Sequence, residues 1–135
     1  MKFYIAAGFS RKNEMAEKAK QLQSMRIGVT STWPWEDASP QAGLAELGDH
    51  HLIVNGSKDL REIEVADGVI LFTQDPTIPF LRGGRMHEFG YAMGLGKRLI
   101  VCGPKENIFH YQPNVEVFAT WEELLTQLGG ENERP

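Results

Sequence analysis

The chain has 135 residues, of which 41% are hydrophobic and 24% are charged, and its formal net charge is −4 at pH 7. This length predicts a single domain that buries roughly two thirds of the surface of the unfolded chain. A negative net charge argues against general nucleic-acid binding, which needs a basic face, although a local group of basic residues could still hold one phosphate.

The cysteine content and the apolar runs predict where the protein works. Cys102 is the single cysteine, so no internal disulfide can form, as expected in a reducing cytoplasm. Cys102 lies in an apolar run and is expected to be inert core. No stretch approaches about 18 apolar residues, and the run at the N-terminus is too short for a signal peptide. We therefore expect a cytoplasmic protein without membrane contact.

The first quarter of the chain alternates between strand and helix patterns. The apolar run "KFYIAA" (2–7) predicts a buried strand. Residues 11–26 place apolar side chains at i, i+4 and i+7, which predicts an amphipathic helix. The β-branched run 27–33 predicts a second strand, and the prolines and glycine of 34–48 predict a loop.

The middle of the chain repeats this alternation. Asn55-Gly56 is typical of a break, and Ser57 then offers an N-cap for a helix over 58–67. The run "GVILFT" (68–73) predicts a third strand. After a proline-containing loop, the spacing of apolar residues predicts a helix over 85–96.

The last third predicts two more strands, at 98–103 and 115–120, and a final helix over 121–128. Thr120 and Glu123 form a capping box for that helix. Residues 129–135 are expected to be a frayed tail. Five strands that alternate with helices predict one α/β domain over 1–128, a parallel sheet with helices on both faces.

Three acids can be sorted by this topology, because ligands of parallel sheets bind beyond the carboxyl ends of the strands. Asp59 and Glu88 lie in the first turns of helices that start at this edge. Asp67 lies at a helix C-terminus, at the opposite edge. We therefore expect Asp59 and Glu88 to converge on one pocket and Asp67 to stay outside it.

Glu88 is the strongest candidate for chemistry. A helix dipole stabilises a carboxylate near its N-terminus, by roughly 0.3–1 kcal/mol at exposed sites. We expect Glu88 to be ionised at neutral pH and able to act as a nucleophile. The alternative is an ordinary first-turn glutamate, but the adjacent Gly-Gly turn, the flanking arginines and the partner acid favour a functional role.

A phosphate site is predicted around the same turn. Arg82 and Arg85 flank Gly83-Gly84 beside the free amides of a helix start. The alternative is a pair of solvated arginines. The segment "GFSRKN" (8–13) could add Ser10, Arg11 and backbone amides. It has neither a Walker pattern nor a complete GxGxxG, which argues against a triphosphate or dinucleotide site.

The remaining candidates have a weaker pattern. Trp33 and Trp35 follow the second strand and could stack on a base, although tryptophan is more often partly buried core. His50-His51 has no cysteine companion at zinc spacing, so no metal site is predicted.

Four segments together resemble the nucleoside 2-deoxyribosyltransferase family, including its short bacterial and phage-type members and the related deoxynucleoside 5'-monophosphate N-glycosidases. The segments are "YIAAGFS", "DLREIEVADGVILFT", "GGRMHEFGYAMGLGKRLIVCG" and "ENIFHYQPNVEVF". The resemblance runs from about Lys2 to Leu128, and its most specific part is the Gly-Gly loop with Glu88 followed by "FGYA" and "GK".

The resemblance implies a flavodoxin-like (Rossmann-like) fold, a homodimer or higher homo-oligomer, and glycosyl transfer with retention and without a cofactor. It assigns the nucleophile to Glu88, a catalytic aspartate to Asp59 and a first-strand tyrosine to Tyr4. In the family, residues after the fourth strand of a neighbouring subunit help to close the site, which points to Asn107 here. Together with the residues above, the expected substrate-binding set is Gly8, Phe9, Ser10, Arg11, Trp33, Arg82, Gly83, Gly84, Arg85 and Asn107.

Two departures from the family bear on the substrate. Arg82 stands where the transferases often carry an acid, and Arg85 stands where a small residue or threonine is frequent. Arginines suit a 5'-phosphate, so a nucleotide is favoured slightly over a free nucleoside. The sequence leaves open the base, the 2'-hydroxyl, and whether water or a second base accepts the sugar.

Three readings of other classes remain beside this one. The first is a non-catalytic nucleotide-binding or sensor domain on the same fold. The second is a glycohydrolase that acts on NAD-like signals. The third is a flavodoxin-like interaction or electron-transfer module.

Overall fold

The computed structural model describes residues 1–36, 48–73 and 83–133. Its centre is a parallel sheet in the order β2-β1-β3-β4-β5, as the alternating pattern predicts. The topology is that of a flavodoxin-like α/β fold. The strands are β1 (Lys2–Ala6), β2 (Gly28–Val29), β3 (Gly68–Phe72), β4 (Arg98–Cys102) and β5 (Val115–Phe118).

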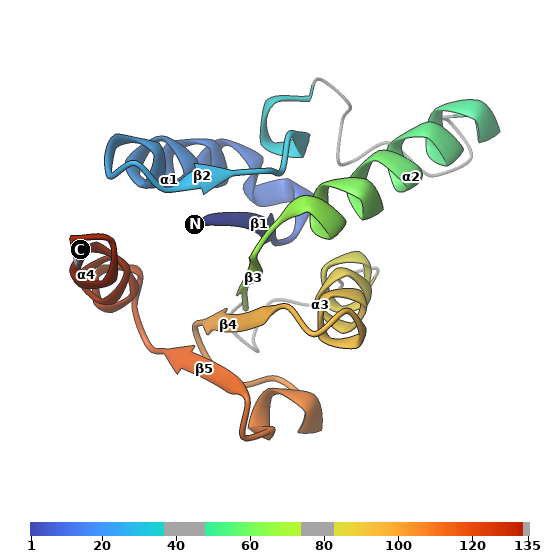
Figure 1. Cartoon of the computed structure of the whole chain (residues 1–135). Coiled ribbons are helices and arrows are strands. Elements are labelled where there is room, and N and C mark those ends of the chain that lie inside the picture. Colours follow the sequence, from blue (N-terminus) through green and yellow to red (C-terminus); the bar gives the residue numbers. More distant parts are fainter. Residues whose placement is uncertain (37–47, 74–82, 134–135) are drawn as a thin grey trace.

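Helices cover both faces of this sheet. In Figure 1, α1 and α4 lie on one side of the strands, and α2 and α3 lie on the other. The α-helices are α1 (Lys12–Ser24), α2 (Asp49–Val65), α3 (Gly84–Gly94) and α4 (Trp121–Asn132). Short 3-10 helices follow three of the strands: η1 (Phe9–Arg11), η2 (Trp33–Trp35) and η4 (Ile108–Tyr111). No helix in the described ranges is both long and apolar enough to span a membrane.

The central strands carry the core. Every residue of β3 is buried, and so are four of the five residues of β1 and of β4. Such continuous apolar runs are typical of parallel strands covered on both faces. The strand order reverses between β1 and β3, and this is where ligands of such sheets bind. The site is therefore expected beyond the carboxyl ends of β1 and β3, next to α2 and α3.

Three sequence-based expectations about element bounds are wrong. Asn55 and Gly56 do not break the chain, because α2 starts at Asp49 and runs through both of them. The second strand has only the two residues of β2, where 27–33 was expected. The tail is not frayed from residue 129, since α4 continues to Asn132 and Glu131 pairs with Arg98 at 3.0 Å.

The final helix starts as expected. The side chain of Thr120 accepts a hydrogen bond from the backbone of Glu123 at 3.2 Å, and Glu123 in turn accepts one from Ala119. Trp121 then donates to Gln21 of α1 and packs against Phe72. The cap therefore directs α4 onto the same face as α1.

Gly68 tests the packing of the sheet. A Cβ at this position would lie 2.8 Å from the carbonyl oxygen of Arg98, so Gly68→Ala should lower the free energy of unfolding by about 1–3 kcal/mol. Gly130→Ala is the matched control, because its Cβ would meet nothing within 4 Å in α4 and should stabilise by about 0.5–1 kcal/mol. Urea unfolding measures both, and an equal effect of the two substitutions would contradict the packing argument.

Candidate active site

Tyr4 and Glu88 form the centre of the site. Tyr4 is a fully buried residue of β1, and its hydroxyl donates a hydrogen bond to Glu88 Oε2. The two residues are 84 positions apart in the chain. The fold thus brings the first-strand tyrosine into contact with the candidate nucleophile.

The start of α3 sets the position of Glu88. Gly83 is the N-cap and has φ = 86°, a left-handed conformation that glycine adopts without strain. Gly83 and Gly84 are exposed, and the backbone of His87 donates to the carbonyl of Gly83 at 3.0 Å. Glu88 is the fifth residue of α3 and reaches back toward β1.

The ionisation of Glu88 differs from the expectation. Burial is the main cause that raises the pKa of its carboxyl to about 8; the nearby Asp59 and Glu62 add to the rise, while the Tyr4 hydrogen bond and Lys58 act against it. Glu88 is therefore mainly protonated at pH 7. The helix dipole does not prevent this, because its effect fades within the first turn and burial disfavours the charged form more strongly.

Asp59 approaches the same place from α2. Burial raises the pKa of its carboxyl, and the neighbouring Lys58 opposes that shift. Its Oδ1 atom is buried and has no hydrogen-bond partner among the described residues, although Lys58 Nζ lies 3.4 Å away. Asp59 is near enough to affect the ionisation of both Glu88 and Tyr4, but it is not in a first turn, because α2 begins ten residues earlier, at Asp49.

Asp67 lies outside this site, as expected. It follows α2, and its carboxylate accepts the backbone N–H of Lys2 at 2.9 Å. The N-terminal ammonium group is 3.7 Å from the same carboxylate. Asp67 therefore caps the amino end of β1, at the edge of the sheet opposite to the acid pair.

Sequence reasoning missed a network of polar side chains between η2 and α2. Lys58 Nζ donates to Thr32 Oγ1 at 3.0 Å and pairs with Glu36. Thr32 Oγ1 donates to Glu62 Oε2 at 2.7 Å, and the Thr32 backbone donates to Glu62 Oε1 at 3.0 Å. The only sequence signal is that Lys58 precedes Asp59 and that Glu62 lies one turn later, on a neighbouring part of the helix surface.

Only one of the two arginines that flank the Gly-Gly turn lies within the described residues. Arg82 lies outside the described residues. Arg85 is buried, with a side chain only 4% exposed, and its two terminal nitrogens bind Glu106 at 2.6 and 3.2 Å. The Nε of Arg85 has no partner among the described residues. Arg85 is therefore tied to the segment after β4 and is not a solvated side chain.

After β1, Arg11 is paired with a glutamate, as Arg85 is. Arg11 forms two hydrogen bonds with Glu14, at 2.8 and 2.7 Å, and a third with the carbonyl of Thr73. Gly8 is the N-cap of η1, Phe9 is its first residue, and the next residue, Ser10, is exposed. The backbone of Arg11 donates to Gly8. Of this segment, Ser10 and the backbone amides remain the groups best placed for a ligand.

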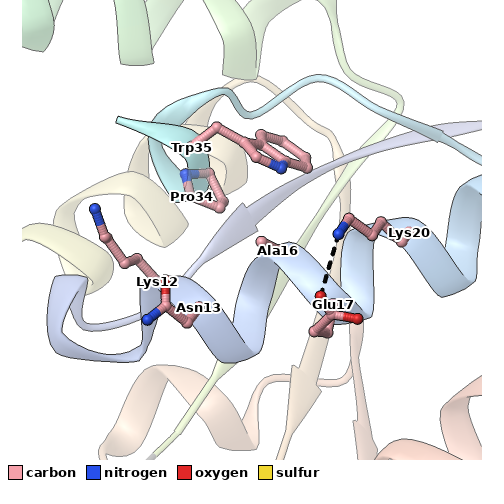
Figure 2. Close-up of a pocket in the computed structure, with 7 residues that line it drawn as sticks. All are labelled: Lys12, Asn13, Ala16, Glu17, Lys20, Pro34 and Trp35. Atoms are coloured by element: carbon pink, nitrogen blue, oxygen red, sulfur yellow. Dashed lines mark hydrogen bonds and ion pairs between the residues drawn. The ribbon is translucent and has the colours of Figure 1, made fainter. Parts of the chain in front are cut away.

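The two tryptophans of η2 have opposite surroundings. Trp33 is 5% exposed, and its indole N–H donates to the carbonyl of Ile5 at 2.7 Å. Its ring belongs to the core and is not presented to an open site. Trp35 is 46% exposed. It lines a groove of about 420 Å³, and Figure 2 shows it with Pro34 on one side of this groove and α1 on the other.

This groove is separate from the candidate active site, since Tyr4, Asp59 and Glu88 are not among the residues that line it. Its lining residues are Lys12, Asn13, Ala16, Glu17, Lys20, Pro34 and Trp35.

Asn107 helps to shape the segment after β4. Its side chain accepts from the backbone of Phe109 at 2.9 Å and caps η4. Its amide lies 3.6 Å from the sulfur of Met86, in α3. The buried His110 accepts from the backbone of Glu106 at 2.9 Å and packs edge-on against Phe89. The segment 106–111 is thus fixed to α3.

The arrangement offers acid–base and nucleophilic chemistry. A carboxyl group that can ionise, a second carboxyl of raised pKa and a phenol meet at one edge of the sheet. Within residues 1–36, 48–73 and 83–133, no three histidine, cysteine, aspartate or glutamate side chains are grouped so as to hold a metal ion.

The solved structures that resemble this fold include two enzymes. A 2-deoxyribosyltransferase from the psychrotolerant bacterium Bacillus psychrosaccharolyticus superimposes with a TM-score of 0.70 at 20% identity, over 92% of this chain and 90% of that one. The CMP N-glycosidase BcmB of Clostridium botulinum gives a TM-score of 0.59 at 19% identity, over 95% of this chain and 98% of that one.

Sequence comparisons add nothing to this relation. No protein-family model matches the chain, and no curated protein matches it. The structural matches extend over nearly the whole length of the chain and of both enzymes. They show that the chain has the fold of a 2-deoxyribosyltransferase and of a nucleotide N-glycosidase, the two groups to which the sequence motifs point.

Proposed function

We propose that the protein cleaves the N-glycosidic bond of a (deoxy)nucleoside or its 5'-monophosphate through a covalent glutamyl-sugar intermediate. The observation that carries the proposal is the Tyr4–Glu88 hydrogen bond beside Asp59 at the edge of the sheet where ligands bind. The similarity in fold to a deoxyribosyltransferase and a CMP N-glycosidase supports the same class of substrate.

The first step needs Glu88 in its ionised form. One Glu88 oxygen forms a bond to C1' of the sugar while the bond from C1' to the base nitrogen breaks. The base leaves with the electron pair of that bond and takes up a proton. Asp59 is suited to supply this proton, because its raised pKa increases the protonated fraction.

The second step releases the sugar. Water, or a second base, attacks C1' and breaks the ester to Glu88, and Asp59 recovers the proton that the attacking group loses. Two displacements at C1' give net retention of configuration. Tyr4 donates to Glu88 Oε2 and would orient the carboxylate before the first step and again after the ester is broken.

The phosphate of a nucleotide substrate would bind near Gly83-Gly84. The exposed backbone amides at the start of α3 are suited to an anion. Arg85 can contribute only the groups that Glu106 leaves free, among them Nε. Arg82 keeps its predicted role as a phosphate ligand. Because Arg11 and Arg85 are each paired with a glutamate, the proposal includes both a free nucleoside and its monophosphate as substrates.

We further propose that the protein forms a homodimer or higher homo-oligomer through η4. Three apolar or aromatic side chains on this short helix are exposed: Ile108, Phe109 and Tyr111, at 72%, 54% and 67%. Grouped exposed apolar side chains mark interaction sites. The buried His110 and the Asn107 cap hold these three side chains in fixed positions. Asn107 therefore belongs to the proposed interface as the residue that caps η4.

One chromatographic screen tests the function and separates it from the other readings. The protein is incubated with deoxynucleosides, ribonucleosides, their 5'-monophosphates and NAD, each with and without a second free base. Release of a free base supports the proposal, and sugar transfer to the second base identifies a transferase. Cleavage of NAD alone would favour a glycohydrolase of NAD-like signals. Binding without cleavage would favour a sensor domain.

Glu88→Gln should lower base release by on the order of 10³-fold or more, because it removes the nucleophile. In the wild type, kcat/KM should rise with pH through about 8, since Glu88 must first lose its proton. Initial rates from pH 5 to 10 measure both effects.

The stability of the same variant provides the control. The wild-type carboxyl has a raised pKa, so the folded state holds a proton that the unfolded state loses above about pH 4.5, and stability falls as the pH rises to about 8. Glutamine has no such proton. The Tm of Glu88→Gln minus the Tm of the wild type should therefore be larger at pH 9 than at pH 4. Normal activity in this folded variant would exclude the mechanism.

Asp59→Asn and Asp67→Asn form a matched pair. Asp59→Asn should lower kcat/KM by about 10²-fold, because it removes a general acid and base. Asp67→Asn should leave the rate within about twofold and lower only stability, since Asp67 binds the amino end of β1. Steady-state rates and urea unfolding distinguish the two effects. A larger loss of rate for Asp67→Asn would contradict the assignment of the site.

The proposed assembly has its own test. The double variant Ile108→Gln/Phe109→Gln should shift the protein toward the monomer, because it removes two exposed apolar side chains from η4. Val65→Gln is the control, since Val65 is also exposed but lies at the end of α2. Size-exclusion chromatography with light scattering gives the mass. A monomeric wild type, or an unchanged mass in the double variant, would refute this interface.

A further inference from the structure

Lys58 lies at the centre of a group of acids. Its ammonium group pairs with Glu36, after η2, and lies 3.4 Å from Asp59 of α2, and it shares the partner Thr32 with Glu62. Glu88 of α3 is within electrostatic range of Lys58, and Tyr4 of β1 donates a hydrogen bond to Glu88. Lys12 of α1 also reaches this region, but its ammonium group donates to the backbone carbonyl of Glu36. Lys58 thus contacts two carboxylates directly, those of Glu36 and Asp59, and acts on a third, that of Glu88, through its charge.

The contacts of Lys58 connect two elements. Its ammonium group binds Thr32 and Glu36, on the chain between β2 and α2, and approaches Asp59 on its own helix. Thr32 in turn donates to Glu62, so both sides of the connection carry an acid. The side chain of Lys58 is mostly buried, at 24% exposed. A partly buried charge is screened less by solvent than a surface one.

We propose that Lys58 is a positioning residue of the candidate active site, whose ammonium group balances the surrounding carboxylates and holds Asp59 against the chain at Thr32–Glu36. This inference rests on the proposed function for its role in the reaction. Nothing in the motifs of the sequence assigns a role to this lysine.

The effect of Lys58 on the two acids has a definite sign. An ammonium group favours the ionised form of a nearby carboxyl, and Lys58 lowers the pKa of both Asp59 and Glu88 against the effect of burial. Without this charge both groups would hold their protons to higher pH. For Glu88 this would reduce the fraction that can attack the sugar at neutral pH.

Two variants separate the charge of Lys58 from its hydrogen bonds. Lys58→Gln removes the charge but keeps an N–H donor for Thr32 or Glu36. Lys58→Arg keeps the charge. Lys20→Gln is the control for net charge, because Lys20 lies on the outer surface of α1 and pairs with Glu17. Circular dichroism and Tm establish that each variant is folded.

The decisive measurement is the pH profile of kcat/KM. In Lys58→Gln its acidic limb should move up by about one pH unit or more, with a roughly tenfold loss below the limb and recovery at higher pH. Lys58→Arg and Lys20→Gln should keep the wild-type limb. A limb that does not move in Lys58→Gln, or a loss that is equal at every pH, would overturn the proposal.

A second readout does not depend on catalysis. Carboxyl ¹³C shifts, assigned with Glu88→Gln and Asp59→Asn, report the titration of the two acids directly. The Glu88 midpoint should rise in Lys58→Gln and stay in place in Lys58→Arg. If the wild type cleaves no substrate, the proposed function fails, and this titration still decides the electrostatic role of Lys58. An unchanged midpoint in Lys58→Gln refutes that role.

Discussion

The hydrogen bond from Tyr4 to Glu88 is the contact on which the candidate site depends. Tyr4 is fully buried in β1, a central strand with neighbours on both sides, so its hydroxyl has little freedom to move. Glu88 comes from a helix whose start is fixed by the left-handed Gly83. The contact joins a buried central strand to the first turns of α3. A displacement of either element would separate the two groups.

Burial of this contact has an electrostatic cost. A carboxyl group shielded from water and close to Asp59 and Glu62 resists ionisation, which is why the pKa of Glu88 reaches about 8. A nucleophile requires the opposite state. The structure contains two opposing influences, the phenol of Tyr4 and the ammonium group of Lys58, both of which lower that pKa. The balance between them and burial sets the pH range in which the site can react.

The sequence was sufficient for the order of the elements, because buried parallel strands give continuous apolar runs. It was misleading at Asn55-Gly56, where local turn preference was overridden by the propagation of α2 from Asp49. Asp59 was placed at the correct edge, although the helix start used to place it was wrong. The pairing of Arg85 with Glu106 and the burial of Trp33 against Ile5 depend on residues more than 20 positions apart. No periodic pattern in the sequence indicates contacts over such distances. Tyr4 was assigned to the site only because of the family resemblance.

The proton on the Glu88 carboxyl also affects how a ligand is bound. In the proposed reaction a sugar can react only after that proton has left, so the productive complex at pH 7 contains one proton fewer than the free protein. Substrate and proton then oppose each other by linkage, and each weakens the binding of the other. Formation of the productive complex releases a proton to the solvent. The heat measured by calorimetry will therefore differ between buffers with different ionisation enthalpies, even when the affinity is the same.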